Sequence, residues 1–98
     1  MYKVLVSCAN GAGSSLMLKM NVEKVFKTMG LEISKIHHCS ISEGKSSARQ
    51  YDMVFTPLNF LSMFKEAEEA GITVIGLRNV LSKVEIEEKI RASGILDK

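Results

Sequence analysis

The stretch that decides the fold is residues 2–15, which read YKVLVSCANGAGSS. Its first part, residues 2–7, is rich in aliphatic and β-branched side chains and predicts a short buried strand. Glycines and small residues follow directly, and from residue 14 to residue 29 apolar side chains recur at helical spacing. The segment is therefore expected to form a strand, a tight glycine-rich turn and a helix.

Three further strands are expected along the chain, at residues 32–38, 52–56 and 72–77. The apolar runs at residues 4–6 and 72–75 do not alternate with polar residues, as is typical of strands buried on both faces. Strands that alternate with helices, joined by right-handed crossovers, predict an α/β fold with a four-stranded parallel sheet in the order 2-1-3-4. Helices on both faces would make it a flavodoxin-like or Rossmann-like three-layer sandwich, with residues 1–98 as a single domain.

The helical segments have recognisable ends. Gly30 and Gly71 stand where a helix end favours a left-handed residue. Ser42 is expected to cap a short helical turn, and Ser82 a last helix that runs to about residue 93, with Glu85 completing a capping box. Residues 59–70 predict a full helix whose apolar face consists of Phe60, Met63, Phe64 and Ala67.

Composition and charge narrow the classes of function. The 98 residues carry a net charge of +2 with dispersed basic side chains, which gives no reason to expect nucleic acid as a partner. No stretch approaches the roughly 20 apolar residues of a membrane span, and residues 1–7 lack a signal-peptide layout, so we expect a cytoplasmic protein without direct membrane insertion. Cys8 and Cys39 should be reduced there, and even with the adjacent His37-His38 pair they fit no zinc-ligand spacing. We therefore expect neither a metal nor a cofactor.

The glycine-rich turn has the chemistry of an anion-binding loop. The candidate residues are Cys8, which would react, and Ala9, Asn10, Gly11, Ala12, Gly13, Ser14 and Ser15, which would bind a phosphoryl group. Glycines let backbone N–H groups converge, and the start of the helix adds unpaired N–H groups and about half a positive charge. Because ligands bind where the strand order reverses, Cys8 is expected at the mouth of the site, with its thiolate favoured over its thiol.

A thiolate in such a loop points to phosphoryl transfer through a phosphocysteine, although a cysteine in a glycine-rich turn is also compatible with simple packing. Cysteine-dependent phosphatases place an arginine six residues after the cysteine, where this sequence has Ser14, so storage of the phosphoryl group is favoured over hydrolysis. Two other functions stay open: a low-molecular-weight phosphatase or arsenate-reductase-like enzyme, and a non-catalytic regulatory docking domain.

Residues 8–20, CANGAGSSLMLKM, closely resemble the phosphorylation loop and first helix of IIB components of the phosphoenolpyruvate-dependent sugar phosphotransferase system. Within the lactose/galactitol/ascorbate-type superfamily they are most similar to the ascorbate-specific branch, as are residues 76–82, GLRNVLS. The resemblance implies that a phosphohistidine on a IIA protein or domain phosphorylates Cys8. It also implies donation to a sugar, such as ascorbate or a related carbohydrate, that the membrane IIC component presents, which brings the chain transiently to the inner face of the membrane. Ala9 departs from the glycine common in the family.

An apolar patch beside the reacting cysteine is a candidate docking surface. Leu16, Met17 and Met20 lie on a different side of the first helix from its buried face, and methionines suit a surface that accepts two partners in turn. Arg78 could approach a partner from the same edge of the sheet. The alternatives are a helix with a wide apolar face and a surface salt bridge for Arg78.

The pair His37-His38 is expected to point to opposite sides of the second strand, one side chain partly buried and one exposed. Cys39 is expected to pack at the end of that strand.

Overall fold

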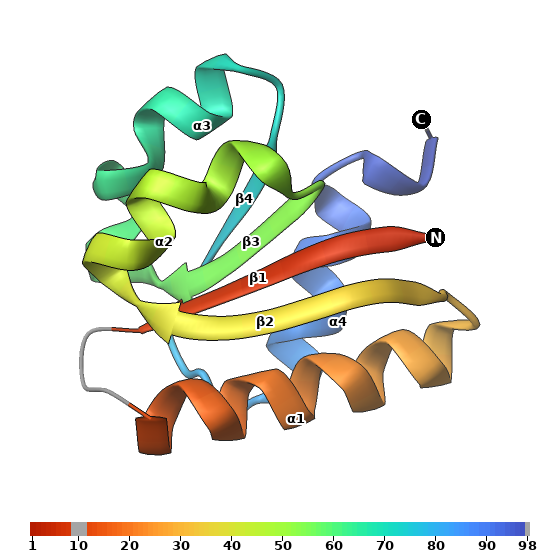
Figure 1. The fold of residues 1–98 in the computed structure, drawn as a ribbon. Coiled ribbons are helices and arrows are strands. Elements are labelled where there is room, and N and C mark those ends of the chain that lie inside the picture. The colour runs from red at the N-terminus through yellow and green to blue at the C-terminus, as the bar shows by residue number, and fades with distance from the viewer. Residues whose placement is uncertain (9–11, 98) are drawn as a thin grey trace.

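Four parallel strands form one sheet in the computed structural model, which describes residues 1–8 and 12–97. The strands are β1 (Tyr2–Cys8), β2 (Ile33–Ser40), β3 (Met53–Pro57) and β4 (Thr73–Leu77). Their order is β2-β1-β3-β4, as Figure 1 shows, which confirms the order predicted from the sequence. Val6 lies between His38 on β2 and Phe55 on β3, so β1 is central.

Helices cover both faces of this sheet (Figure 1). One face is covered by α1 (Ala12–Met29) and α4 (Lys83–Ala92). On the other face lie α2 (Ile41–Ser47), the 3₁₀ helices η1 (Ala48–Gln50) and η2 (Leu58–Phe64), and α3 (Lys65–Glu69). A short 3₁₀ turn, η3 (Ile95–Asp97), follows α4.

Each face has its own apolar core, because successive residues of a strand point to opposite sides. Val4, Val6 and Cys8 belong to the core under α1 and α4, whereas Leu5 belongs to the core under α2 and α3. The predicted apolar face of α1 is confirmed, with Leu18, Val22, Val25 and Phe26 at most 3% exposed.

Two element boundaries differ from the sequence prediction near the carboxyl end of β1. Helix α1 begins at Ala12, two residues earlier than expected, and β2 continues to Ser40, two residues further. Since Cys8 pairs with Ser40 in the sheet, the strand pairing extends β2. Ser40 rather than Ser42 is consequently the N-cap of α2, where its Oγ accepts a hydrogen bond from the Glu43 N–H.

The helix expected at residues 59–70 is instead η2 followed by α3. Phe64 of η2 and Ala67 of α3 are buried as expected. A 3₁₀ helix turns every three residues, and in η2 it leaves Met63 41% exposed, contrary to expectation. Its first turn packs against the sheet at Gly76, where an added Cβ would lie 2.9 Å from Leu58 Cδ1. Gly30 and Gly71 have the expected positive φ values of 73° and 95°.

Helix α2 packs on β1 through Gly44, so Gly44→Ala is expected to lower the free energy of unfolding by about 1–3 kcal/mol. An added Cβ would lie 2.8 Å from Ser7 Cβ and 3.4 Å from Cys39 Sγ. Helix propensity alone would act in the opposite direction, by about 1 kcal/mol.

Urea denaturation measures the effect of Gly44→Ala. Ser46 is exposed on the same helix, and Ser46→Ala is the matched control. Its free energy of unfolding is expected to lie within about 0.5 kcal/mol of that of the parent protein. A Gly44→Ala protein that is at least as stable as the parent would contradict the close packing of α2.

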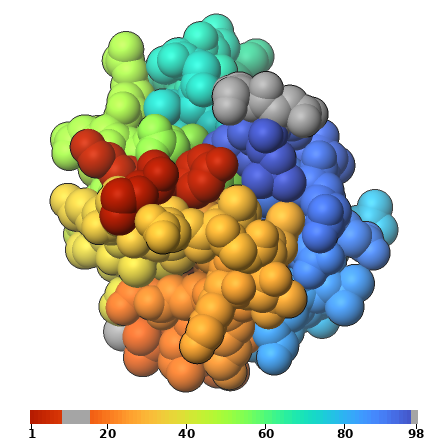
Figure 2. All heavy atoms as spheres, turned by 90° about the vertical axis from the view of Figure 1, so that its right-hand side faces the viewer, coloured from red at the N-terminus to blue at the C-terminus, as the bar shows by residue number. Residues whose placement is uncertain are grey.

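The two ends of the described chain lie together at the amino end of the sheet. Figure 2 shows the red N-terminal atoms beside the dark-blue atoms that follow α4. Tyr2 and Ile95 pack in the same core cluster there. Neither end of the described chain therefore lies at the carboxyl edge of the sheet, where the predicted site is.

Candidate functional site

The strand order reverses between β1 and β3, at the carboxyl edge of the sheet. After β1 the chain crosses to the α1 face, and after β3 it crosses to the face that carries η2 and α3. Ligands of open α/β sheets bind at this kind of reversal, because the two connections leave a crevice between them. Cys8 is the last residue of β1 and therefore stands at this reversal, as predicted.

The sulfur of Cys8 is more deeply buried than the sequence suggested. Cys8 is 1% exposed and belongs to the apolar core under α1 and α4. Burial and, to a smaller extent, the nearby Cys39 raise the pKa of the Cys8 thiol to about 11. Within the described residues, this raised pKa contradicts the expectation that the thiolate of Cys8 is favoured over its thiol.

The anion-binding loop itself is only partly described. Ala9, Asn10 and Gly11 lie outside the described residues. Ala12, Gly13, Ser14 and Ser15 form the first turn of α1, but their side chains are outside the described part of the chain. Helix α1 thus begins four residues after Cys8. The amino end of a helix is the positive end of its dipole, and in α1 this end follows Cys8 closely along the chain.

The raised pKa of Cys8 can be measured as the pH at which half of its thiol is ionised. In a Cys39→Ala protein Cys8 is the only thiol, and its ionisation midpoint should lie above the ordinary 9.0 and toward about 11, because burial disfavours the thiolate. Thiolate absorbance against pH measures it, with the cysteine-free double variant subtracted to remove the tyrosine signal. A midpoint below 9.0 would instead mean that loop amides outweigh burial.

The loop after β4 is held by Glu85. Its carboxylate accepts hydrogen bonds from the backbone N–H groups of Arg78 at 2.8 Å and Asn79 at 2.9 Å. Burial acts to raise the pKa of Glu85, but these two N–H groups and the charges of Lys89 and Arg78 lower it overall. Ser82 caps α4 as predicted, since its Oγ accepts from Glu85 N–H at 3.2 Å, yet Glu85 binds the loop instead of completing a capping box.

The exposed apolar residues of α1 lie next to this loop. Leu16, Met17 and Met20 are 43%, 51% and 47% exposed, which agrees with the predicted exposed patch. Asn21 Nδ2 donates to the Val80 carbonyl at 3.3 Å and so ties α1 to the loop. Leu81 in the same loop is also exposed, and Arg78 is exposed at the start of the loop.

A buried polar group lies on the opposite face of the same edge. Ser7 Oγ donates to the Ser40 carbonyl at 2.8 Å, and the Cys39 thiol donates to Ser7 Oγ at 3.9 Å. Burial and the Glu43 charge raise the pKa of Cys39 against the lowering effect of Ser7. Thr56 Oγ1, at the end of β3, is buried without a hydrogen-bond partner among residues 1–8 and 12–97.

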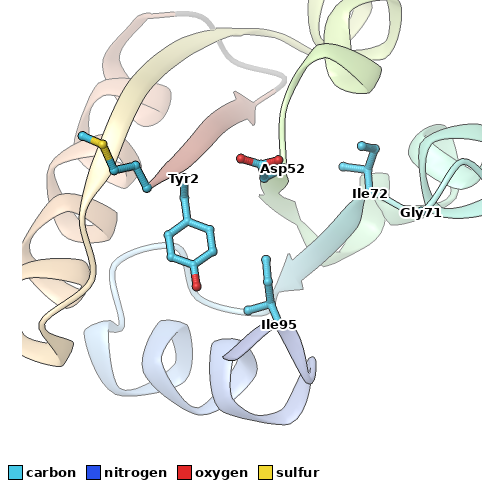
Figure 3. Close-up of a pocket in the computed structure, with 6 residues that line it drawn as sticks. Tyr2, Asp52, Gly71, Ile72 and Ile95 are labelled. Atoms are coloured by element: carbon cyan, nitrogen blue, oxygen red, sulfur yellow. The ribbon is translucent and has the colours of Figure 1, made fainter. Parts of the chain in front are cut away.

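A pocket of about 310 Å³ lies at the other end of the sheet (Figure 3), lined by Met1, Tyr2, Asp52, Gly71, Ile72 and Ile95. The Asp52 carboxylate accepts the Lys3 backbone N–H at 2.8 Å, so it ties β1 to the residue just before β3. Because this pocket is at the amino ends of the strands, it is separate from the Cys8 edge.

Among the described residues, no helix is long and apolar enough to cross a membrane.

Sequence reasoning missed the role of Glu85 at this edge. A glutamate three residues after a helix cap was a visible signal, but its use for the preceding loop depends on how β4 enters α4. His37 and His38 are exposed and half-buried respectively, and Cys39 is buried, as predicted.

Comparisons with known proteins identify the family of the chain. Residues 3–92 match the family model described as "PTS system, Lactose/Cellobiose specific IIB subunit". The chain is 26% identical over 87 residues to the "Ascorbate-specific PTS system EIIB component" of Mycoplasma pneumoniae, with 89% of this chain and 88% of that protein covered. It is 27% identical over 92 residues to the protein of the same name from Salmonella typhimurium, with coverages of 90% and 84%.

A solved structure has the same fold. It is the lactose-specific IIB component domain of the phosphoenolpyruvate:carbohydrate phosphotransferase system (PTS) from Streptococcus pneumoniae. The TM-score is 0.61 at 20% identity, and the match covers 93% of this chain and 88% of that one.

Proposed function

Since this chain belongs to the family of lactose/cellobiose-specific IIB subunits of the PTS, a set of phosphotransferase components of sugar transport, we propose that Cys8 carries a phosphoryl group within that system. The observation that carries the proposal is the position of Cys8, which ends the central strand β1 where the strand order reverses, four residues before α1 begins. A phosphoryl group on its sulfur would lie close to the positive end of that helix, which favours a dianion.

The phosphoryl group arrives from a phosphohistidine of a IIA protein or domain. The Cys8 sulfur attacks phosphorus, a P–S bond forms, and the P–N bond to the histidine breaks. With its pKa raised to about 11, resting Cys8 holds its proton near neutral pH. That proton passes to the departing imidazole nitrogen, whose basicity rises as the P–N bond breaks.

The second transfer goes from phosphocysteine to a sugar hydroxyl held by the membrane IIC component. A P–O bond forms, the P–S bond breaks, and the hydroxyl proton returns to the sulfur. In the proposed role, residues 9–15 bind the phosphoryl oxygens through backbone N–H groups and the hydroxyls of Ser14 and Ser15 during both steps. This places the protein at the inner face of the membrane only while IIC is bound.

Ascorbate or a related carbohydrate is the proposed acceptor. The curated relatives reported above are named as ascorbate-specific, and they cover most of this chain. The lactose-specific structure, at 20% identity, supports the fold rather than the sugar.

The exposed patch formed by Leu16, Met17 and Met20 is the proposed docking surface for both partners, with Arg78 at its edge. Met17→Asp is expected to slow phosphoryl transfer about tenfold or more, because a charge would be buried against an apolar partner. The rate of IIA-dependent phosphorylation measures the effect.

Met63→Asp is the matched control for the docking surface. Met63 is 41% exposed on η2, which covers the other face of the sheet. The free energy of unfolding of each variant should lie within about 0.5 kcal/mol of that of the parent protein. Equal transfer rates in the two variants would remove Met17 from the docking surface.

One assay separates a carrier from its alternatives. The protein is incubated with phosphoenolpyruvate, the general phosphotransferase proteins and a matching IIA, and a thiol-bound phosphate is then sought. A carrier is labelled and passes the label to sugar when IIC membranes are added. Unaided hydrolysis of a generic phosphate ester would identify a phosphatase, and neither labelling nor hydrolysis would identify a docking domain; both results contradict the proposal.

A further inference from the structure

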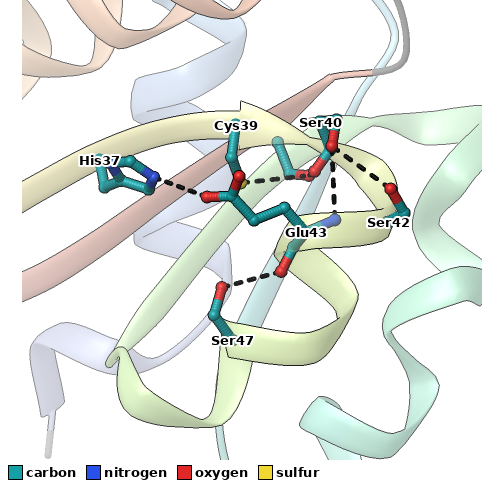
Figure 4. A network of polar contacts seen from close by, with 7 residues as sticks. His37, Cys39, Ser40, Ser42, Glu43 and Ser47 are labelled. Carbon is teal, nitrogen blue, oxygen red and sulfur yellow. Dashed lines mark hydrogen bonds and ion pairs between the residues drawn. The ribbon is translucent and has the colours of Figure 1, made fainter.

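Three side chains at the junction of β2 and α2 form a cluster of potential metal ligands. They are His37 and Cys39 of β2 and Glu43 of α2, whose ligand atoms all lie within 4.8 Å of one another. Figure 4 shows the Glu43 carboxylate reaching from α2 toward the two strand side chains. We propose that these three residues form a binding site for a divalent transition-metal ion, with Zn²⁺ as the ion that their chemistry fits best.

The distances between the three side chains are close to those of a bound ion. Zinc bonds of about 2.0–2.3 Å in a tetrahedral site put neighbouring ligand atoms roughly 3.3–3.7 Å apart. His37 Nε2 and Glu43 Oε2 are already 2.9 Å apart, and the largest separation in the cluster is at most 4.8 Å. Side-chain rotation of His37 and Glu43, both on the surface, can supply the remaining movement without a change in the backbone.

The fold brings the ligands together for two reasons. Residues two apart on a strand point to the same face, which places His37 and Cys39 side by side on β2. The chain then enters α2 directly, where Ser40 Oγ accepts the Glu43 N–H and Ser47 Oγ donates to the Glu43 carbonyl at 3.0 Å. The backbone of Glu43 is thereby held beside the strand.

The ligand types indicate zinc rather than calcium or magnesium. One thiolate, one imidazole and one carboxylate are the donors that Zn²⁺ accepts, whereas Ca²⁺ and Mg²⁺ prefer oxygen ligands alone. Three protein ligands leave a fourth position for water. The side chains of His37 and Glu43 are 46% and 60% exposed, so the cluster opens to solvent on their side, whereas Cys39 closes it on the core side. On binding, a Zn–S bond replaces the S–H bond of Cys39, and its proton passes to the buffer.

The cluster is separate from the proposed phosphoryl site. Cys39 belongs to the core under α2 and α3, whereas Cys8 belongs to the core under α1 and α4. His38, next to His37 in sequence, is not one of the three clustered side chains, which makes it a natural control. The two sites can therefore be tested one at a time.

Cobalt is the spectroscopic probe, because a Co²⁺–thiolate bond gives an intense near-ultraviolet charge-transfer band. Untagged, reduced full-length protein should bind one Co²⁺ or Zn²⁺ ion per chain, with Zn²⁺ displacing Co²⁺. The band should persist in Cys8→Ser, where Cys39 is the only thiol, and disappear in Cys39→Ser. His37→Ala and Glu43→Gln should each weaken affinity at least about tenfold, and His38→Ala should leave it unchanged.

Thermal unfolding provides an independent readout on folded protein. Zn²⁺ should raise the unfolding temperature of the parent and of His38→Ala, but not of His37→Ala, since only ions bound to the native state stabilise it. Circular dichroism without metal checks that each variant is folded. A band that follows Cys8 instead of Cys39, or equal losses of affinity in His37→Ala and His38→Ala, would overturn the site.

Discussion

Replacing Cys8 by alanine is expected to reduce phosphorylation of the sugar by at least about a thousandfold, because the atom that holds the phosphoryl group between donor and acceptor is lost. The rate is measured with phosphoenolpyruvate, the general phosphotransferase proteins, a matching IIA and membranes that contain IIC. Alanine removes the sulfur from a position that is 1% exposed, so circular dichroism must show that the variant keeps its fold.

Cys39→Ala is the matched control for this experiment. Cys39 is the only other cysteine in the chain and is also buried, but it lies in the other core. Its removal should leave the transfer rate within a few-fold of the parent. Substantial transfer by Cys8→Ala, or an equal loss in Cys39→Ala, would contradict a phosphocysteine at position 8.

Phe55→Ala is expected to lower the free energy of unfolding by about 3–5 kcal/mol, the largest stability effect of the substitutions considered. Phe55 is fully buried on β3, and its ring centroid lies 6.2 Å from that of Phe26 on α1. The substitution leaves a cavity in the core that also contains Cys8. Since a domain of this size is stabilised by about 5–15 kcal/mol, urea denaturation should show a large loss.

Phe60→Ala removes the same atoms at a partly buried position on η2 and serves as the control. Phe60→Ala should lower the free energy of unfolding clearly less than Phe55→Ala does, because the side chain of Phe60 is already in part solvated and the surrounding surface can relax. Equal losses for the two phenylalanines would contradict the assignment of Phe55 to the rigid centre of the sheet.

The architecture could be predicted because its signals are local. Apolar runs such as residues 4–6 predict strands buried on both faces, and β1 and β4 are found there with buried residues. The periodic apolar face of α1 and the left-handed Gly30 likewise depend on nearby residues alone. Right-handed crossovers then left few strand orders to consider, which is why the observed order was predicted.

The errors arose where one element acts on another. Pairing of Cys8 with Ser40 lengthens β2 and moves the cap of α2 to Ser40. The close approach of Leu58 to Gly76 accompanies a 3₁₀ helix that periodicity alone read as an α-helix. Neither contact has a signal within its own segment.

In the site, too, features that depend on nearby residues were predicted, and features that depend on contacts between elements were not. The position of Cys8 at the reversal followed from strand order, but its burial depends on how α1 and α4 close over β1, so the direction of its pKa shift was predicted wrongly. The cluster of His37, Cys39 and Glu43 was also missed. A search for ligand spacing considers cysteines and histidines close in sequence, whereas the third ligand comes from the next element.

The most direct measurement is the location of the phosphoryl group after transfer from phosphorylated IIA. The full-length protein is phosphorylated, kept near neutral pH and mapped by mass spectrometry of its peptides. We expect one phosphoryl group per chain, on the sulfur of Cys8. A phosphoryl group on His37 or His38, or none on any residue after complete phosphorylation of IIA, would contradict the carrier role of Cys8.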